Sequence, residues 1–221
     1  NALSGDHPLS YRPLKVALGM PVTIDHSDSV KSFPSYFHLL FSITGIAIGA
    51  LMVPFLVVAN WFWNRGPLFY TQERVGKDGA LFKIYKFRSM VENAEANGAV
   101  FSKIGDTRVT PFGKFLRKTR IDEIPQFLNI LKGDMGVIGP RPERPMFVEE
   151  ISAIMPFYET RHIIKPGLTG WAQVNYNYGE SIEESLVKLQ YDLYYIKHRS
   201  VFIDISIVFK TISTVVFYRG Q

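Results

Sequence analysis

The chain has 221 residues, and its 25 lysines and arginines exceed its 20 aspartates and glutamates, for a formal net charge of +5. This balance favours anionic partners such as phosphates, nucleotides or an acidic lipid surface. Nucleic acid is not expected as a partner, because the sequence shows no long basic run, zinc-ligand spacing or helix-turn-helix pattern. Cysteine is absent, which excludes disulfides, a thiolate nucleophile and a cysteine-ligated metal.

A long apolar segment lies in the N-terminal part of the chain. Leu39–Ala59 carries no charge, and about 20 consecutive apolar residues are enough for a helix to span a bilayer. Trp61 and Arg65 follow it, as in an interfacial anchor. We therefore expect a membrane helix at residues 36–64. Residues 1–35 are expected to be a tail or the remnant of an upstream region, since the chain does not begin with methionine.

The path of this helix depends on Pro54. Proline cannot donate an amide to the helix and crowds the preceding turn, so a kink or break is expected there. Basic residues lie on both sides, Lys31 before the segment and Arg65 and Lys77 after it, which is typical of a segment that enters and leaves on the same face. These residues leave three alternatives open: a re-entrant helix, a kinked transmembrane span and a buried helix of a soluble domain.

Two strand-like stretches come next. Gly66–Gly76 and Leu81–Met90 flank a Lys-Asp-Gly turn, and the second alternates apolar and polar residues, so they predict a β-hairpin. Lys86 and Arg88 occupy polar positions of this hairpin. They are either a solvated strand face or part of a site, and Arg88 lies where the strand pattern ends.

The remaining chain is expected to be mainly helical. The predicted elements are a short helix at Val91–Asn97, a helix that begins at Thr110-Pro111, a second helix from Ile121 to Leu131, a helix at Met146–Arg161 interrupted around Pro156, a turn and short strand over Lys165–Val174, a helix at Ser181–Ile196 and a last one at Val201–Arg219. The last is apolar but contains Asp204 and Lys210, so it is either an interfacial helix or a core-packing helix. The expected fold class is α/β (α+β), a membrane-associated helical domain with a small β-hairpin and amphipathic interfacial helices.

Two adjacent carboxylates, Asp122 and Glu123, lie at the expected start of the second helix. Pro125 fits only in the first turn of that helix, which places Asp122 at or near the N-cap. Asp122 is therefore either a capping residue or a nucleophile. The preceding cations, Arg117 and Arg120 among them, would favour an ionised carboxylate and a bound phosphate. Two carboxylates beside phosphate oxygens are also a suitable set for Mg²⁺.

A rigid arginine follows further along. Arg141 lies between Pro140 and Pro142, which restrict the backbone on both sides. This suits bidentate phosphate recognition, and the alternative is a stiff surface loop.

Several segments together resemble the bacterial sugar transferases, that is, the monotopic polyprenyl-phosphate phosphoglycosyl transferases, and most of all the catalytic part of their large members. The resemblance extends from Phe37 to the C-terminus, with the blocks in the family's order. These blocks are Lys86–Met90, Arg117–Gln126, Lys132–Met135, Gly139–Pro142 and Lys165–Asn175. The chain departs from the family at Val53, where a serine is frequent, and at Asn177, where some relatives carry an arginine.

The resemblance implies transfer of a hexose-1-phosphate from a UDP-hexose to undecaprenyl phosphate, which yields a polyprenyl-diphosphate-sugar and UMP and initiates exopolysaccharide, capsule or O-antigen synthesis. It implies that Asp122 is the covalent nucleophile and that Glu123 is tied to Mg²⁺ and proton handling. Both carboxylates are thus the expected catalytic residues and metal ligands. The expected substrate-binding residues are Lys86, Arg88, Arg117, Pro140, Arg141, Pro142 and Arg161.

The resemblance also implies a membrane arrangement. Pro54 matches the proline at which the family's re-entrant helix breaks, so both helix ends would face the cytoplasm at the bacterial inner membrane. Residues 65–221 would then be the cytoplasmic catalytic domain. Membrane lipids are expected partners, and a homodimer is compatible with the resemblance.

Two other classes of function compete. A non-catalytic, lipid-binding membrane scaffold makes no use of paired carboxylates beside rigid arginines. A phosphate-ester hydrolase with an aspartyl-phosphate needs no membrane segment, and the sequence lacks a clear phosphatase Asp-x-Asp after a strand. Release of a nucleoside monophosphate that depends on polyprenyl phosphate would separate the three.

Overall fold

The structure is a computed structural model that describes residues 34–96, 98, 100, 105–155, 157–176 and 182–216. Most of the expected N-terminal tail, and Asn177, lie outside the described residues. The elements in chain order are α1 (Ser35–Trp63), β1 (Phe69–Val75), η3 (Lys77–Gly79), β2 (Leu81–Phe87), α2 (Pro111–Lys118), η4 (Ile121–Gln126), α3 (Phe127–Lys132), β3 (Gly136–Ile138), α4 (Pro145–Ile154), η5 (Tyr158–Ile163), β4 (Gly167–Thr169), α5 (Trp171–Asn175), α6 (Ile182–His198) and α7 (Val201–Val216), where η denotes a 3₁₀ helix. The fold is α+β, since helices are joined by two two-stranded sheets in the part of the chain described.

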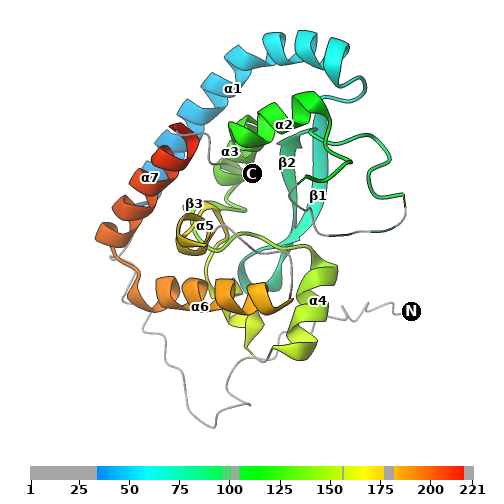
Figure 1. Cartoon of the computed structure of the whole chain (residues 1–221). Coiled ribbons are helices and arrows are strands. Elements are labelled where there is room, and N and C mark those ends of the chain that lie inside the picture. The colour runs from blue at the N-terminus through cyan, green and yellow to red at the C-terminus, as the bar shows by residue number, and fades with distance from the viewer. Residues whose placement is uncertain are drawn as a thin grey trace, which may run out of the picture.

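The apolar segment is one helix, α1, and in the described chain it is the helix whose length and composition would allow it to cross a membrane. The helix is continuous through Pro54 and arches over α2 and α3 (Figure 1). Of the kink or break expected at this proline, the described helix shows no break, and its axis is bent (Figure 1). Around Pro54, where one helical hydrogen bond is lost, Met52, Val53 and Leu56 of α1 pack in the cluster that contains Phe87 and Leu116.

Both ends of α1 are tied to the same body of the protein. Near its start, His38 Nδ1 accepts a hydrogen bond from the Val137 amide at 3.2 Å. At its end, Asn60 Nδ2 donates to the Gly66 carbonyl and Asn64 Nδ2 donates to the Arg88 carbonyl, both at 2.8 Å. The helix therefore lies along the domain instead of projecting from it.

The hairpin of β1 and β2 is confirmed. The strands pair antiparallel from Phe69↔Phe87 to Val75↔Leu81, and the turn places Asp78 at φ 55, a left-handed conformation that aspartate tolerates better than most residues. The short helix expected at Val91–Asn97 is wrong, because residues 92–96 form turns. Seven residues are too few to nucleate a helix unless packing supports it.

The small parallel sheet of β3 and β4 joins two distant sequence blocks. Gly136 pairs with Gly167, and Ile138 pairs with Thr169. The strand expected over Lys165–Val174 is confirmed only in this short β4. The chain then forms α5, because Trp171 and Val174, three residues apart, both pack into the core.

Three apolar clusters hold the elements together. The first lies under α1 and contains Leu56, Phe87 and Leu116, with Ile121 and Ile124 of η4 against it. A central cluster joins β2, α3, β3, α6 and α7, and a third joins α4, η5 and α6. In consequence, η4 is clamped between the apolar helix and the hairpin.

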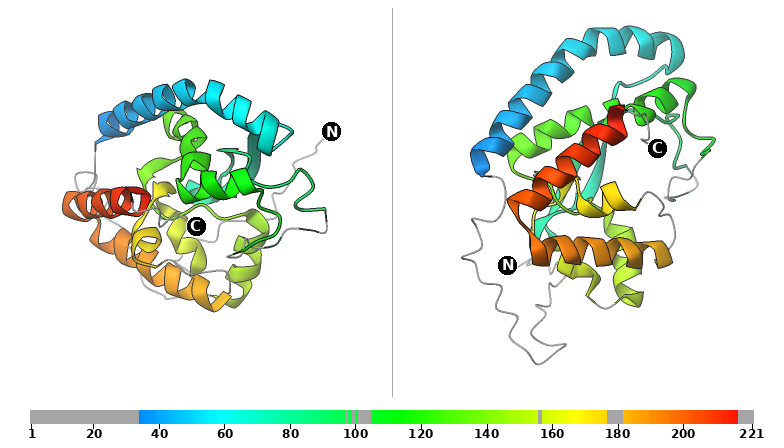
Figure 2. Two further views of the ribbon diagram at one scale, coloured as in Figure 1. Left: turned by 45° about the horizontal axis from the view of Figure 1, so that its top comes forward. Right: turned by 60° about the vertical axis from the view of Figure 1, so that its left-hand side comes forward.

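The last helix, α7, has two apolar faces. Ile207 is fully buried in the central cluster, whereas Phe202 and Phe209 are 85% and 69% exposed. Figure 2 shows α7 and α1 along the same side of the molecule. The core-packing interpretation is confirmed for the side of α7 that carries Ile207. The interfacial role of the exposed side stays a prediction.

Candidate active site

The paired carboxylates lie in the first turn of η4. Arg120 precedes this 3₁₀ helix with φ 58, and this left-handed residue redirects the chain after α2. Residues three apart align in a 3₁₀ helix, so Ile121 and Ile124 point together toward the cluster beneath α1. Asp122 and Glu123 are buried at 6% and 7% exposure and face the cations described below. The two isoleucines thus form an apolar face of η4, and the two carboxylates form a charged face of the same turn.

Glu123 is the centre of an ionic cluster. Its Oε1 lies 2.7 Å from Nη2 of Arg141 and 3.3 Å from Nζ of Lys86, and its Oε2 lies 3.4 Å from Nη1 of Arg120. Burial alone would raise the pKa of Glu123, but these three cations hold that pKa well below its ordinary value. Burial lowers the pKa of Lys86 to about 8, against the opposing effect of Glu123.

Asp122 differs from its neighbour. Its Oδ1 is buried and has no hydrogen-bond partner among the described residues, so this oxygen does not cap the helix. Burial and the Glu123 charge raise the pKa of Asp122 to about 6, and they outweigh Lys86, Arg117 and Arg120, which lower it as expected. A buried carboxylate oxygen without a partner is costly unless a ligand uses it.

Arg117 reaches the site from α2. Its Nε donates to Ser89 Oγ at 2.9 Å, and Thr110 begins α2 by accepting the Gly113 amide at 2.9 Å, as the sequence predicts. Ser89 was not identified from the sequence, since a serine after a strand carries no distinguishing signal.

The loop around Arg141 is held by its own backbone. The Pro140 carbonyl accepts from the Gly167 amide at 2.9 Å, and the Pro142 carbonyl accepts from Arg74 Nη1 at 3.2 Å. A Cβ on Gly167 would collide with the Gly139 amide, so the two segments touch backbone to backbone. The two prolines therefore act on the site through the shape of this loop.

Gln173 is a second residue that the sequence analysis did not select. Its Oε1 accepts from Arg141 Nη1 at 3.2 Å, while its Nε2 is buried without a partner among the described residues. It carries no charge, and only the parallel pairing of β3 with β4 brings it beside Arg141.

Two predicted substrate-binding arginines lie behind the site. Arg161 donates to Asp192, to the Tyr158 hydroxyl and, at 2.9 Å, to the Arg141 carbonyl, so it supports the loop.

Arg88 is 7% exposed, and its guanidinium donates to four backbone carbonyls. These acceptors are Asn64, Arg65, Pro67 and Met90. The geometry gives Arg88 a structural role at the end of α1 instead of the expected phosphate contact.

The residues present fit a magnesium ion only together with a substrate. No group of three or more acidic or histidine ligands occurs in the described residues, and both Glu123 oxygens already pair with cations. The Asp122 carboxylate, whose Oδ1 has no partner among the described residues, could supply one ligand. Mg²⁺ often binds one or two carboxylates and completes its shell with phosphate oxygens and water, so this donor set is sufficient once a diphosphate is bound.

The chain is similar to known proteins over most of its length. The family model for bacterial sugar transferases matches residues 30–218. A UDP-N-acetylgalactosamine-undecaprenyl-phosphate N-acetylgalactosaminephosphotransferase of Aeromonas hydrophila is 52% identical over 152 residues, which cover 69% of this chain and 36% of that protein. A UDP-glucose:undecaprenyl-phosphate glucose-1-phosphate transferase of Klebsiella pneumoniae is 41% identical over 151 residues, which cover 67% of this chain and 32% of that protein. The chain thus spans about a third of the length of these two relatives.

Proposed function

The chain belongs to the bacterial sugar transferase family, and we propose that it transfers a sugar-1-phosphate from a UDP-sugar to undecaprenyl phosphate through a phosphosugar carried on Asp122. The names of its relatives make UDP-N-acetylgalactosamine and UDP-glucose the first donors to test. The product would be an undecaprenyl-diphosphate-sugar, which initiates synthesis of a surface glycan.

One observation carries the proposal: the buried Asp122 Oδ1 is left without a protein partner among the described residues, although cations surround it. In the first step this oxygen would attack the phosphorus that bears the sugar, and the bond from that phosphorus to the nucleotide oxygen would break to release UMP. In the second step a phosphate oxygen of undecaprenyl phosphate would attack the same phosphorus and free the carboxylate. Splitting one displacement into two is the usual gain of a covalent intermediate.

The cations have a separate task. The donor diphosphate and the leaving UMP are negatively charged, and Lys86, Arg120 and Arg141 converge on Glu123 within 3.4 Å. Preorganised charges of this kind stabilise developing negative charge without rearrangement. Glu123 would hold them in place. Because its pKa is strongly lowered, we assign it this electrostatic role in preference to proton transfer.

Magnesium would be held by the donor phosphates and by the oxygen of Asp122 that does not attack, and it would supply charge neutralisation of the diphosphate. The protein contribution is then one carboxylate and the surrounding cations, which orient the phosphates. Full turnover in excess chelator would contradict this assignment.

The membrane arrangement is also a proposal: α1 enters and leaves the inner membrane on its cytoplasmic face. It is supported by the anchors at both helix ends and by the exposed apolar side chains of α1 between them, such as Leu51 and Phe55. Cysteine is absent from the chain, so Tyr36→Cys and Asp78→Cys can be labelled without background. A membrane-impermeant thiol reagent should miss both positions in intact cells and reach them after lysis. Labelling at position 36 in unbroken cells would indicate a transmembrane span.

The test of the reaction is Asp122→Asn. We expect this variant to release no UMP from UDP-N-acetylgalactosamine or UDP-glucose, because the covalent path is lost. Mass spectrometry of the wild-type chain incubated with donor alone should place a phosphosugar on the peptide that contains Asp122. The control is Asp78→Asn, an exposed carboxylate in the hairpin turn, which should keep full turnover. Turnover by Asp122→Asn would refute the proposed nucleophile. Release of many equivalents of UMP per protein without undecaprenyl phosphate would instead favour a hydrolase, because the proposed transferase releases one equivalent on loading. No release at all would favour a scaffold.

A further inference from the structure

Gln126, the last residue of η4, has a buried side chain whose nitrogen lacks a hydrogen-bond partner among the described residues. The residue is 1% exposed, so bulk water does not reach this nitrogen. Gln126 also precedes α3 as its N-cap residue, but its side chain makes no capping hydrogen bond. A buried N–H group without an acceptor lowers the stability of a fold, and in a native protein it calls for an explanation such as a catalytic role or a bound water. This amide is therefore a candidate donor to a ligand at η4.

The geometry of η4 places Gln126 on the same face as Glu123. Residues three apart lie above one another in a 3₁₀ helix. Ile121 and Ile124 are one such pair, and both pack against the cluster beneath α1. Glu123 and Gln126 are another pair of this kind, so the amide follows the carboxylate on which the cations converge.

The neighbours of Gln126 along this row both face β2. Glu123, one turn before it, pairs with Nζ of Lys86 at 3.3 Å. Asn129, three residues after it, accepts a hydrogen bond from the Tyr85 amide at 3.1 Å. Gln126 therefore lies between a member of the ionic cluster and a side chain that completes the edge of β2.

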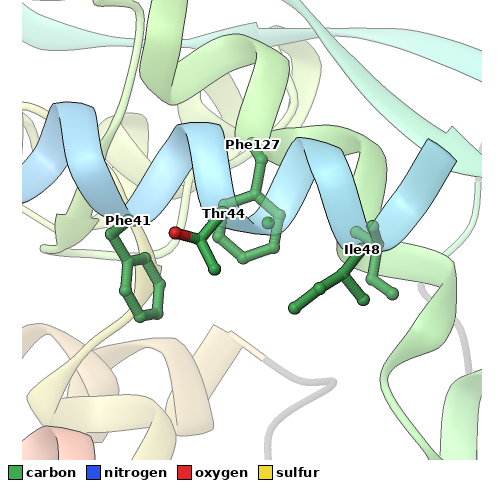
Figure 3. Close-up of a pocket in the computed structure, with 6 residues that line it drawn as sticks. Phe41, Thr44, Ile48 and Phe127 are labelled. Atoms are coloured by element: carbon green, nitrogen blue, oxygen red, sulfur yellow. The ribbon is translucent and has the colours of Figure 1, made fainter. Parts of the chain in front are cut away.

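The apolar side of η4 borders a small cavity, and Gln126 does not line it. This cavity has a volume of about 200 Å³ and is lined by Phe41, Thr44, Gly45, Ile48, Ile124 and Phe127. In Figure 3 the Phe127 side chain lies against α1, and its ring centroid is 5.5 Å from that of Phe41. The side chains of two consecutive residues thus separate, since Phe127 packs on α1 whereas Gln126 stays on the polar side with Glu123.

From this placement we propose that Gln126 is a catalytic residue whose Nε2 donates a hydrogen bond to a phosphoryl oxygen of the sugar phosphate as it moves to Asp122. The inference rests on the proposed function. Three cations surround Glu123 within 3.4 Å, and phosphoryl oxygens are the acceptors that such cations bind. The amide reaches the same group from the next turn of η4.

This hydrogen bond acts on the loading step. A carboxylate oxygen of Asp122 forms a bond to phosphorus, the bond from phosphorus to the UMP oxygen breaks, and its electron pair leaves with UMP. Gln126 neither gains nor loses a proton, and its N–H group faces the negative charge on the phosphoryl oxygens while these bonds change. A donor that is fixed in place beforehand stabilises the transition state without rearrangement. Because the amide is neutral, it adds this hydrogen bond without altering the charge balance around Glu123 and Asp122.

The test is Gln126→Met, which removes the amide and retains a side chain of similar length. Single-turnover UMP release from UDP-N-acetylgalactosamine or UDP-glucose measures loading of Asp122. We expect the loading rate at saturating donor to fall at least tenfold and the donor concentration for half-maximal rate to stay within twofold, because the contact forms in the transition state. The midpoint of chemical unfolding should not fall, since the lost N–H group had no partner among the described residues. Loading at the wild-type rate would overturn the inference, whatever the stability.

Ser152→Ala is the matched control. Ser152 Oγ in α4 is also buried without a partner among the described residues, but it lies outside η4. We expect Ser152→Ala to load at the wild-type rate, with an unfolding midpoint no lower than that of wild type. Equal slowing in both variants would show that loss of any unpaired buried polar group slows loading, and it would overturn the role of Gln126.

A structure of the wild-type chain loaded with donor alone covers the case in which Gln126→Met does not fold. We expect Gln126 Nε2 within about 3.2 Å of a phosphoryl oxygen of the phosphosugar on Asp122. A larger separation, or an ordered water as the partner of Nε2 in place of that oxygen, would overturn the inference. If the wild-type chain releases no UMP and carries no phosphosugar, the proposed function fails instead. Equal loading by the wild type and by Gln126→Met contradicts the role of Gln126 alone.

Discussion

Arg88 is buried and Arg141 is half-buried, each beside a proline or a turn, and their surroundings differ. The Arg88 guanidinium is shared among four backbone carbonyls at the end of α1. Arg141 bonds two side chains, Glu123 and Gln173, and its own side chain is 37% exposed. Carbonyl acceptors take four of the five N–H donors of Arg88, whereas the Arg141 guanidinium is partly exposed and could also contact a phosphate.

This difference indicates how the protein divides its tasks. One arginine fixes where the apolar helix ends, and the other belongs to the charged face of η4. Strand β2 links the two regions, because it carries Lys86, which pairs with Glu123, and ends at Phe87, directly before Arg88. Variants of the two regions should therefore separate stability from turnover.

The largest effect is expected behind Arg141, at the ion pair of Arg161 with Asp192, whose side chains are 5% and 2% exposed with 2.8 Å between Nη2 and Oδ2. Burial raises the pKa of Asp192 although Arg161 opposes this, so pairing does not fully offset desolvation. Asp192→Asn would leave a buried cation unpaired, which costs about 3–5 kcal/mol of the free energy of unfolding. Chemical unfolding in detergent would measure it. A loss below about 1 kcal/mol would show that water reaches Arg161.

The next effect is expected at the other arginine. In Arg88→Lys a single ammonium replaces a planar fork, and several buried carbonyls lose their donor at about 1–3 kcal/mol each. We expect about 3 kcal/mol lower stability and faster proteolysis near Gly66, with turnover per folded molecule within twofold of wild type. Arg65→Lys, at an exposed position, is the control. A selective loss of donor affinity in stable Arg88→Lys protein would restore the phosphate contact predicted from the sequence.

A smaller effect is expected for Arg141→Lys, and it should be on turnover, not on stability. Lysine keeps the charge beside Glu123 but cannot contact Glu123, Gln173 and a phosphate together. We expect kcat/KM for the UDP-sugar to fall at least tenfold, about 1.4 kcal/mol in transition-state free energy, with little change in stability. Arg144→Lys, which retains a cation opposite Glu95, should leave kinetics unchanged. If Arg141→Lys and Arg88→Lys change stability and kcat/KM to the same extent, the two arginines do not differ as described.

Local patterns predicted much of this arrangement. The hairpin, the start of α2 at Thr110-Pro111 and the position of Asp122 in the first turn of a helix follow from strand alternation and proline geometry. The role of Arg88 did not follow, because its acceptors are backbone carbonyls, which every residue carries. Similarly, the support of Arg141 by Arg161 and Gln173 depends on the β3–β4 pairing and on contacts more than 18 residues apart.

The membrane helix shows the same limit. Its length and apolar character are local properties, so they are evident in the sequence. The residues around Pro54 pack on Phe87, Leu116 and η4, which are distant in sequence. The close approach of α1 to Phe127 and Ile124 requires Gly45 and Gly49. Nothing in the spacing of these residues specifies which helix they meet.

The smallest effect is expected from pH, which should change the stability of η5, the element whose Arg161 supports the Arg141 loop. His162 in η5 is buried, its Nε2 has no partner among the described residues, and burial with the neighbouring Arg161 lowers its pKa from 6.5 to about 3. Below pH 6.5, His162 therefore binds a proton in the unfolded chain but stays neutral in the folded protein. The free energy of unfolding is highest above that pH and falls as the pH decreases. Between pH 6.5 and 5.5 the loss should be about 1 kcal/mol. His162→Gln, which does not titrate, should remove it. At pH 5.5 the protection of η5 amides against hydrogen exchange, corrected for the intrinsic rate at each pH, should fall before that of the amides at the end of α1. An identical pH profile for wild type and His162→Gln would mean that His162 is protonated in the folded protein.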